Sequence, residues 1–306
     1  MKLGTRGSRL ALWQAEWVRS RLAARGTTIE VVVIKTRGDA EIDRPLHMLE
    51  GKGFFTKEIE DALLDGRIDA AVHSLKDLPT RFPEGLALAA IPERADPVDV
   101  LVAKGGATVA TSLAALAPGA RLGTSSLRRV AQAKHVRPDI EVVPLRGNVP
   151  TRVAKVKEGK GGLDAAMLAA AGLERLGLSS DIAARLDPLE IMPAPGQGAL
   201  GLEIRADDRA AREALATLAH EPTTRAVTAE RALLAALEGG CQAPVAAYVG
   251  QPATGNAVVL FGRVTAPDGS VQLTASAPFD GTNPVSVGEE VARLLIAQGA
   301  EKFLAR

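Results

Sequence analysis

The chain has 306 residues, 46% hydrophobic and 24% charged, which is long enough for two or three domains of ordinary globular composition. Its 37 basic and 36 acidic residues nearly cancel without forming long runs of one sign, which argues against a nucleic-acid or membrane-surface partner. No apolar run approaches the ~18 residues of a bilayer span, and the first residues lack the apolar core of a signal peptide, so we expect a cytoplasmic protein. The single cysteine and four scattered histidines have no metal-ligand spacing, so no metal site is expected.

The N-terminal residues combine a strand, a glycine turn and a helix. Residues 2–5 predict a short strand, and the apolar spacing of residues 10–18 predicts a helix with Ser8 as its N-cap. Arg6 and Arg9 add positive charge where the N–H groups of a helix start can bind an anion. Ser8 alone is more simply a plain helix cap.

The following segments continue a β/α pattern. The β-branched run 30–36 predicts a strand buried on both faces, and the long connection 37–53 is typical of a functional lid. A helix over 54–64 and a strand over 68–74 follow. This strand leads into Asp77, and α/β sheets bind ligands at the carboxyl ends of their strands. An Asp before Leu-Pro can equally be a turn former.

Two stretches then recur in the same order. Residues 122–129 repeat the pattern of residues 3–10, namely strand, Gly-Thr, hydroxyl cap, arginine and helix, and residues 161–167 resemble residues 66–72. These repeats predict two lobes of like architecture. Between them we expect a strand over 140–144, a turn over 145–148 and a helix over 150–157, and a second anion site made by three arginines: Arg128, Arg146 and Arg152.

The literal G-x-G-x-x-G at 196–201 is not a dinucleotide fingerprint, because prolines precede it and a strand, not a helix, follows it. We interpret it as the return of the chain to the first lobe. From residue 221 the pattern changes to a helix over 224–237, strands over 245–249, 257–264 and 272–277, and a closing helix over 284–304. The predicted fold is therefore α/β, with doubly wound lobes over 1–93 with 199–217 and over 98–193, and a small α+β domain over 221–306.

Cys241 follows Gly239-Gly240 at the end of the predicted helix 224–237, on a tight turn near the surface. As the only cysteine it cannot form an internal disulfide. A lone cysteine is as often a small buried hydrophobic residue as a functional thiol, and the turn by itself leaves both readings open.

Seven motifs together resemble the porphobilinogen deaminase (hydroxymethylbilane synthase) family along essentially the whole chain. They occupy residues 11–15, 51–58, 71–79, 123–129, 145–148, 195–199 and 238–242. The resemblance implies a transferase of tetrapyrrole and heme biosynthesis that joins four porphobilinogen units, with loss of ammonia, to a covalent dipyrromethane cofactor and releases hydroxymethylbilane. It also implies two lobes like those of periplasmic binding proteins, a monomeric enzyme, and transfer of the product to uroporphyrinogen-III synthase.

The resemblance assigns roles to individual residues. Cys241 carries the dipyrromethane cofactor through a thioether, and Asp77 is the catalytic carboxylate that stabilises a cationic pyrrole and moves its proton. The other assigned residues contact the cofactor (Ser74, Lys76, Thr124, Ser126, Arg128, Arg129 and Arg146), bind substrate (Arg6, Ser8, Arg146, Arg152 and Arg175) or belong to the lid (Lys52 and Lys57). Arginines suit this substrate because a guanidinium holds a carboxylate through paired N–H bonds.

Two other function classes compete with this interpretation. A periplasmic-type anion-binding protein without catalysis also has two α/β lobes, but the missing signal peptide and the third domain with Cys241 argue against it. A cysteine hydrolase would need a histidine partner, and no histidine lies in a motif that places it by the thiol. The intact mass, with or without one dipyrromethane, would distinguish these classes.

Overall fold

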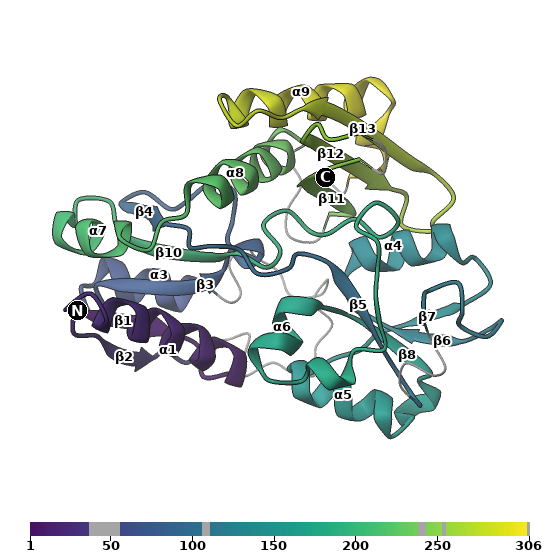
Figure 1. Cartoon of the computed structure of the whole chain (residues 1–306), viewed down its shortest axis with the longest axis horizontal. Coiled ribbons are helices and arrows are strands. Elements are labelled where there is room, and N and C mark those ends of the chain that lie inside the picture. The colour runs from purple at the N-terminus through teal and green to yellow at the C-terminus, as the bar shows by residue number, and fades with distance from the viewer. Residues whose placement is uncertain (37–55, 106–110, 238–242, 253–254, 305–306) are drawn as a thin grey trace. The chain divides into compact units, whose positions relative to one another are not determined.

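The computed structural model describes residues 1–36, 56–105, 111–237, 243–252 and 255–304. The chain forms two compact units, Met1–Ala95 with Gly198–Thr224 and Asp96–Gln197 with Arg225–Arg306 (Figure 1). The first unit contains the predicted first lobe. The second contains both the second lobe and the third domain. No helix in the described ranges has the length and apolar character needed to cross a bilayer.

The first unit is built on one five-stranded sheet of order β2-β1-β3-β10-β4. The first three of these strands run parallel, and β10 is antiparallel to both of its neighbours. The elements are β1 (Lys2–Thr5), α1 (Arg9–Ala23), β2 (Glu30–Val33), α3 (Lys57–Leu64), β3 (Ala70–Ser74), the 3₁₀ helix η2 (Leu75–Asp77), β4 (Leu86–Ala90), β10 (Leu200–Arg205) and α7 (Arg209–Ala216).

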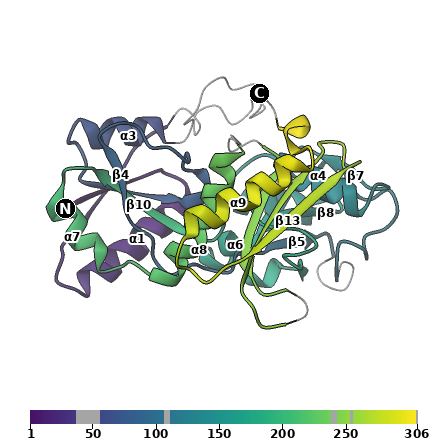
Figure 2. The same cartoon turned by 90° about the horizontal axis from the view of Figure 1, so that it is seen from above.

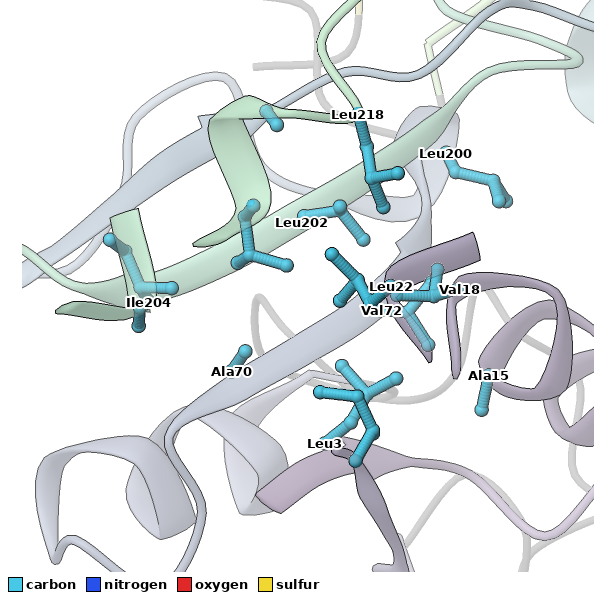
Figure 3. Packing of buried hydrophobic residues seen from close by; sticks show 14 residues of the cluster. Leu3, Ala15, Val18, Leu22, Ala70, Val72, Leu200, Leu202, Ile204 and Leu218 are labelled. Carbon is cyan, nitrogen blue, oxygen red and sulfur yellow. The ribbon is translucent and has the colours of Figure 1, made fainter. Parts of the chain in front are cut away.

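Helices cover both faces of this sheet because alternate strand residues point to opposite sides. Leu3, Val72 and Leu202 pack with side chains of α1 and α7 on one face (Figure 3). Ala71 lies on the other face, with Ile59 and neighbouring residues of α3. Both clusters are almost fully buried, so the sheet has a core on each side.

One expectation about this sheet was wrong. The run 30–36 was expected to be a strand buried on both faces, but β2 is an edge strand of four residues and Val33 is 51% exposed. β-branched residues favour an extended backbone at an edge as well as at the centre of a sheet, and only the order of the strands distinguishes the two.

The second unit contains a sheet of the same design, of order β7-β6-β8-β5-β9. Its elements are β5 (Asp99–Ala103), β6 (Arg121–Gly123), α4 (Leu127–Val136), β7 (Glu141–Val143), α5 (Val149–Lys157), η4 (Lys160–Gly162), β8 (Ala165–Ala169), α6 (Ala170–Arg175), η5 (Ser179–Asp181) and β9 (Ala184–Arg185). α4 packs on one face of the sheet and α5 on the other. Strand by strand, β1, β2 and β3 correspond to β6, β7 and β8, so the predicted internal repeat is confirmed.

The rest of the second unit is an antiparallel sheet of three strands, covered by helices. The strands are β11 (Val245–Gly250), β12 (Val259–Thr265) and β13 (Gln272–Pro278), and the helices are α8 (Glu221–Ala236), α9 (Pro284–Ala297) and the 3₁₀ helix η6 (Ala300–Phe303). Leu233 of α8 and Val291 of α9 share one core with β12. Figure 2 shows α9 beside β13 of this sheet. Gly288 permits this close packing, because a Cβ there would lie 2.4 Å from the carbonyl oxygen of Ala229.

Several predicted boundaries shift. The closing helix was expected over 284–304, but α9 ends at Ala297, and Gly299, with φ of 93°, begins the separate turn η6. The helix expected over 54–64 begins at Lys57 in the described residues. The strand expected after 196–201 is β10, which returns to the first sheet as predicted.

Candidate functional site

The first unit gathers five of the predicted site residues at the end of its sheet where the parallel strands have their carboxyl ends. β1 and β3 are parallel neighbours, with Leu3 opposite Ala70, so the turns that follow them lie at the same edge. The turn after β1 carries Arg6 and Ser8, and the turn after β3 carries Lys76 and Asp77, directly after Ser74. The side-chain amide of Gln14 donates to Ser74 Oγ at 2.9 Å and so links α1 to the end of β3.

Ser8 is the N-cap of α1, as predicted. Its backbone is extended and its Oγ accepts the N–H of Ala11 at 3.2 Å. The cap fixes the direction in which the chain leaves β1, and with it the turn that holds Arg6.

Asp77 ends the short 3₁₀ helix that follows β3. Leu75 and Leu78 on either side are buried, and the N–H of Leu75 donates to the carbonyl oxygen of Ala199, directly before β10, at 3.0 Å. Asp77 itself is exposed. The burial of Leu75 and Leu78 therefore fixes the position of a turn on which the Asp77 side chain is exposed.

In the second unit the turns after β6 and β7 are joined by hydrogen bonds. Ser125 Oγ donates to the carbonyl oxygen of Leu145 at 3.0 Å and accepts its N–H at 3.1 Å. Ser126 and Arg146 are the next residues on each side of this pair, so they belong to one edge of the sheet.

The backbone of the loop after β7 accepts hydrogen bonds from two side chains of α5. Arg152 Nε donates to the carbonyl oxygen of Gly147 at 2.6 Å, and Lys155 Nζ donates to that of Arg146 at 2.9 Å. Gly147 has a φ of 111°, and a Cβ there would meet Thr151 at 2.9 Å. Glycine therefore suits this turn, whose backbone holds the Arg152 side chain.

Arg128 and Arg129, in the first turn of α4, share one buried carboxylate. Arg128 Nη2 lies 2.8 Å from Asp99 Oδ2, and Arg129 Nη2 lies 2.8 Å from Asp99 Oδ1. Asp99 is fully buried and the two arginines are 4% and 6% exposed. Burial by itself would raise the pKa of Asp99, but the two guanidinium groups outweigh it and hold the pKa well below its ordinary range.

This cluster contains more positive than negative charge. Two guanidinium groups face one carboxylate. Among the described residues, the buried Nε atoms of both arginines have no hydrogen-bond partner, and Ser126, the N-cap of α4, makes no side-chain cap bond. Burial lowers the pKa of Arg128, and the Asp99 carboxylate opposes that shift. A helix start with uncompensated arginines favours an added anion, so the cluster fits the carboxylates of a bound ligand.

The remaining predicted residues lie in the following places. Thr124 is buried, and its Oγ1 accepts the N–H of Ser126 at 3.3 Å. Arg175 is the last residue of α6, and burial lowers its pKa to about 10, so it stays charged at neutral pH. Lys57 begins α3 and is exposed, 3.4 Å from Asp61. Lys52 and Cys241 lie outside the described residues.

The structure adds buried titratable groups that the sequence analysis missed. Asp99 joins the arginine cluster, and in the first unit His73 Nε2 lies 3.0 Å from Glu203 Oε2 in a buried pair. Burial raises the pKa of the neighbouring Glu60. Asp99 is the first residue of the strand DVLVA and Glu203 lies inside the strand LGLEIR, and an acid within or beside such an apolar run is the signal that could have found them. Within the described residues no three His, Cys, Asp or Glu side chains are grouped to hold a metal ion.

The chain matches two family models that together cover most of its length. Residues 1–213 match "Porphobilinogen deaminase, dipyromethane cofactor binding domain", and residues 224–297 match "Porphobilinogen deaminase, C-terminal domain". The porphobilinogen deaminase of Geobacter sulfurreducens is 49% identical over 308 residues, which cover 100% of this chain and 94% of that protein. That of Moorella thermoacetica is 50% identical over 306 residues, covering 99% of this chain and 95% of that protein.

Solved structures of two binding proteins are similar to this chain at much lower sequence identity. The methionine binding protein MetQ aligns with a TM-score of 0.45 and 14% identity, over 71% of this chain and 89% of that chain. A periplasmic substrate-binding protein of an ABC transporter from Coxiella burnetii aligns with a TM-score of 0.43 and 15% identity, over 76% of this chain and 96% of that chain.

Proposed function

The chain belongs to the porphobilinogen deaminase family, and on this premise we propose which of its residues carry out the reaction. The enzyme is a transferase that joins four porphobilinogen units, with loss of ammonia, to a covalent dipyrromethane cofactor and releases hydroxymethylbilane. The sequence-based predictions of family, fold class, enzyme class and cofactor are thereby confirmed. The non-catalytic binding protein is not favoured.

We propose that Cys241 holds the cofactor through a thioether. The cysteine follows α8, which ends at Ala236, and precedes β11, which begins at Val245, so both ends of its segment are anchored in the second unit. When bound, the cofactor supplies the pyrrole end to which the porphobilinogen units are added.

The observation that carries the proposal is the excess positive charge around Asp99. Arg128 and Arg129 are the residues proposed to bind the cofactor's carboxylates, because their Nε atoms, buried at the start of α4, have no hydrogen-bond partner in the part of the chain that the structure describes. Thr124, Ser126 and Arg146, at the same edge, are proposed to complete this side, and Arg152 and Arg175 to bind later rings. Ser74 and Lys76 of the first unit are also proposed cofactor contacts.

Asp77 is the proposed catalytic carboxylate. Loss of ammonia from porphobilinogen leaves a cationic pyrrole, and an exposed carboxylate on a fastened turn can stabilise that charge and take up a proton. Arg6 and Ser8, at the same edge of the sheet, are proposed to bind the carboxylates of the incoming unit, with Lys52 and Lys57 in a covering lid.

The test is a comparison of Asp77→Asn with Cys241→Ser. Asp77→Asn is expected to keep its affinity for porphobilinogen but to lose ~10²-fold or more in kcat, because a fixed charge acting on a developing charge is removed. The rate is expressed per adduct-bearing molecule, counted by intact mass. Cys241→Ser should have the mass of the bare chain and no turnover. Near-normal kcat of Asp77→Asn would exclude the assigned role.

Three further parts of the proposal rest on the family resemblance. The enzyme is proposed to be a cytoplasmic monomer. Its linear product needs a ring-closing enzyme to consume it, and uroporphyrinogen-III synthase is the proposed recipient.

A further inference from the structure

The segment 189–197 of the second unit is held by side chains from three different elements. Arg263 of β12 binds its first carbonyl groups, Gln132 of α4 binds both backbone groups of Met192, and Glu230 of α8 accepts the N–H of Gly196 at 2.8 Å. The segment is irregular, and these side chains take the place of a regular backbone pairing. Its position is therefore set by long-range polar contacts.

Arg263 makes the largest share of these contacts. Nη2 donates to the carbonyl oxygen of Leu189 at 2.7 Å, and Nη1 donates to that of Glu190 at 2.8 Å and to Gln132 Oε1 at 2.9 Å. The residue is 7% exposed, and burial lowers its pKa to about 10, so it is charged at neutral pH. Burying a charged guanidinium that is bound mainly to neutral oxygens costs free energy of folding. This cost indicates that Arg263 does more than keep a surface strand in water.

The contacts continue from Arg263 to the cofactor-binding arginines. Gln132 Nε2 donates to the carbonyl oxygen of Met192 at 3.0 Å, and the Met192 N–H donates to Gln132 Oε1 at 2.8 Å. The same Met192 carbonyl accepts a hydrogen bond from Arg128 Nη1 at 2.5 Å. A buried path therefore runs from Arg263 through Gln132 and Met192 to Arg128.

We propose that Arg263 is a positioning residue for Arg128. It holds Gln132 and the segment 189–197 so that the Met192 carbonyl binds Nη1 of Arg128 while Asp99 binds Nη2, which leaves Nε for a cofactor carboxylate. The inference rests on the proposed role of Arg128 in cofactor binding. Arg263 itself contacts neither cofactor nor substrate in this scheme.

The test measures cofactor assembly, which does not depend on the activity of loaded enzyme. Apo-protein made in cells that lack porphobilinogen is mixed with porphobilinogen, and intact mass follows the gain of one dipyrromethane. Arg263→Leu should slow this gain about tenfold, because small displacements of a group that supports a site cost 10- to 100-fold. Arg263→Lys should fall between wild type and Arg263→Leu, because one ammonium cannot reproduce the forked contacts.

Arg137, the C-cap residue of α4, supplies a matched control. Its Nη1 also donates to three carbonyl oxygens, those of Leu113, Ala114 and Leu116, which lie outside the segment 189–197. Arg137→Leu should destabilise the protein, as measured by urea unfolding, and should leave the rate of cofactor assembly within twofold of wild type. If Arg263→Leu and Arg137→Leu slowed cofactor assembly equally, in step with the stability that each loses, the proposal would be overturned.

Arg128→Leu separates this inference from the proposed function. Arg128→Leu should slow assembly strongly, and Arg263→Leu in that background should add no further slowing, because both act through one group. Independent, additive slowing would overturn the positioning role while leaving Arg128 as a cofactor residue. Wild-type assembly by Arg128→Leu would overturn the proposed role of Arg128, and the inference with it.

Discussion

At the scale of single residues, Asp99 determines whether two buried arginines can be tolerated at the start of α4. It is fully buried, and its two oxygens each contact a different guanidinium at 2.8 Å. Gln197 Nε2 also donates to Asp99 Oδ1 at 2.7 Å and thereby fixes the carboxylate plane. The carboxylate holds both guanidinium groups in place without satisfying all of their donors.

Asp99→Asn is expected to destabilise the protein by about 3–5 kcal/mol at pH 7, because it leaves two buried cations without a counter-charge. Since folding lowers the Asp99 pKa, its stabilisation is present above the unfolded value of 3.8 and is lost as pH falls below it. The difference in the free energy of unfolding between wild type and Asp99→Asn should therefore become smaller below about pH 4. Urea unfolding at pH 7 and pH 3.5 measures this difference, with Asp207→Asn at an exposed position as the control. A gap that did not change with pH would contradict this account.

At the scale of elements, the start of α5 shows how a local cap supports a site loop. Asn148 Oδ1 accepts the backbone N–H of Thr151 at 3.0 Å and its hydroxyl at 2.8 Å. The cap directly follows Gly147, whose carbonyl oxygen holds Arg152. The helix start and the arginine loop therefore form one local structure.

Asn148→Ala is expected to cost about 1 kcal/mol, the usual loss for a helix N-cap. The control is Asn283→Ala, because Asn283 occupies the N-cap of α9 without a side-chain cap bond and should cost less. Thermal or urea unfolding of the two variants gives the comparison. Equal losses would show that the cap bond of Asn148 is not what stabilises α5.

At the scale of the whole molecule, the second unit unites two sheets through buried polar contacts. Arg263 of β12 bonds to Gln132 of α4, and the Ala247 N–H of β11 donates to the Pro193 carbonyl oxygen at 3.1 Å. Breaking such contacts leaves buried charge and carbonyl groups unsatisfied, so the α+β domain should not open independently of the second lobe.

Native-state hydrogen exchange in rising urea tests this cooperativity. Amides of β12 and of β8 are expected to reach the same opening free energy with the same dependence on urea, because they belong to one cooperative unit. Arg263→Leu should lower the opening free energy of β12 more than that of β8. Arg137→Leu should leave the opening free energies of β12 and β8 equal to each other. Earlier opening of β12 in the wild-type protein would count against a single unit.

Much of the candidate site could be predicted from local sequence. The cap at Ser8, the return strand after Pro195 and the paired lobes rest on short-range signals, such as capping side chains, glycine turns and strand propensity, that act within a few residues. Matched motifs identified the family, and the roles that they assign to its arginines stay predictions. Segments outside the described residues, among them Lys52 and Cys241, keep their sequence-based roles as proposals.

Other features required the tertiary structure. The edge position of β2 depends on strand order, the shared carboxylate of Asp99 on residues 30 apart, and the Arg263–Gln132 contact on residues 131 apart. No local pattern specifies which partner meets a buried charge, because that partner is set by packing of distant elements. By itself the sequence determined the lobes, the family and the residues available for the chemistry. The tertiary structure decided which of those residues are buried together and which buried contacts orient them, since a polar group enters the core only where its partners converge.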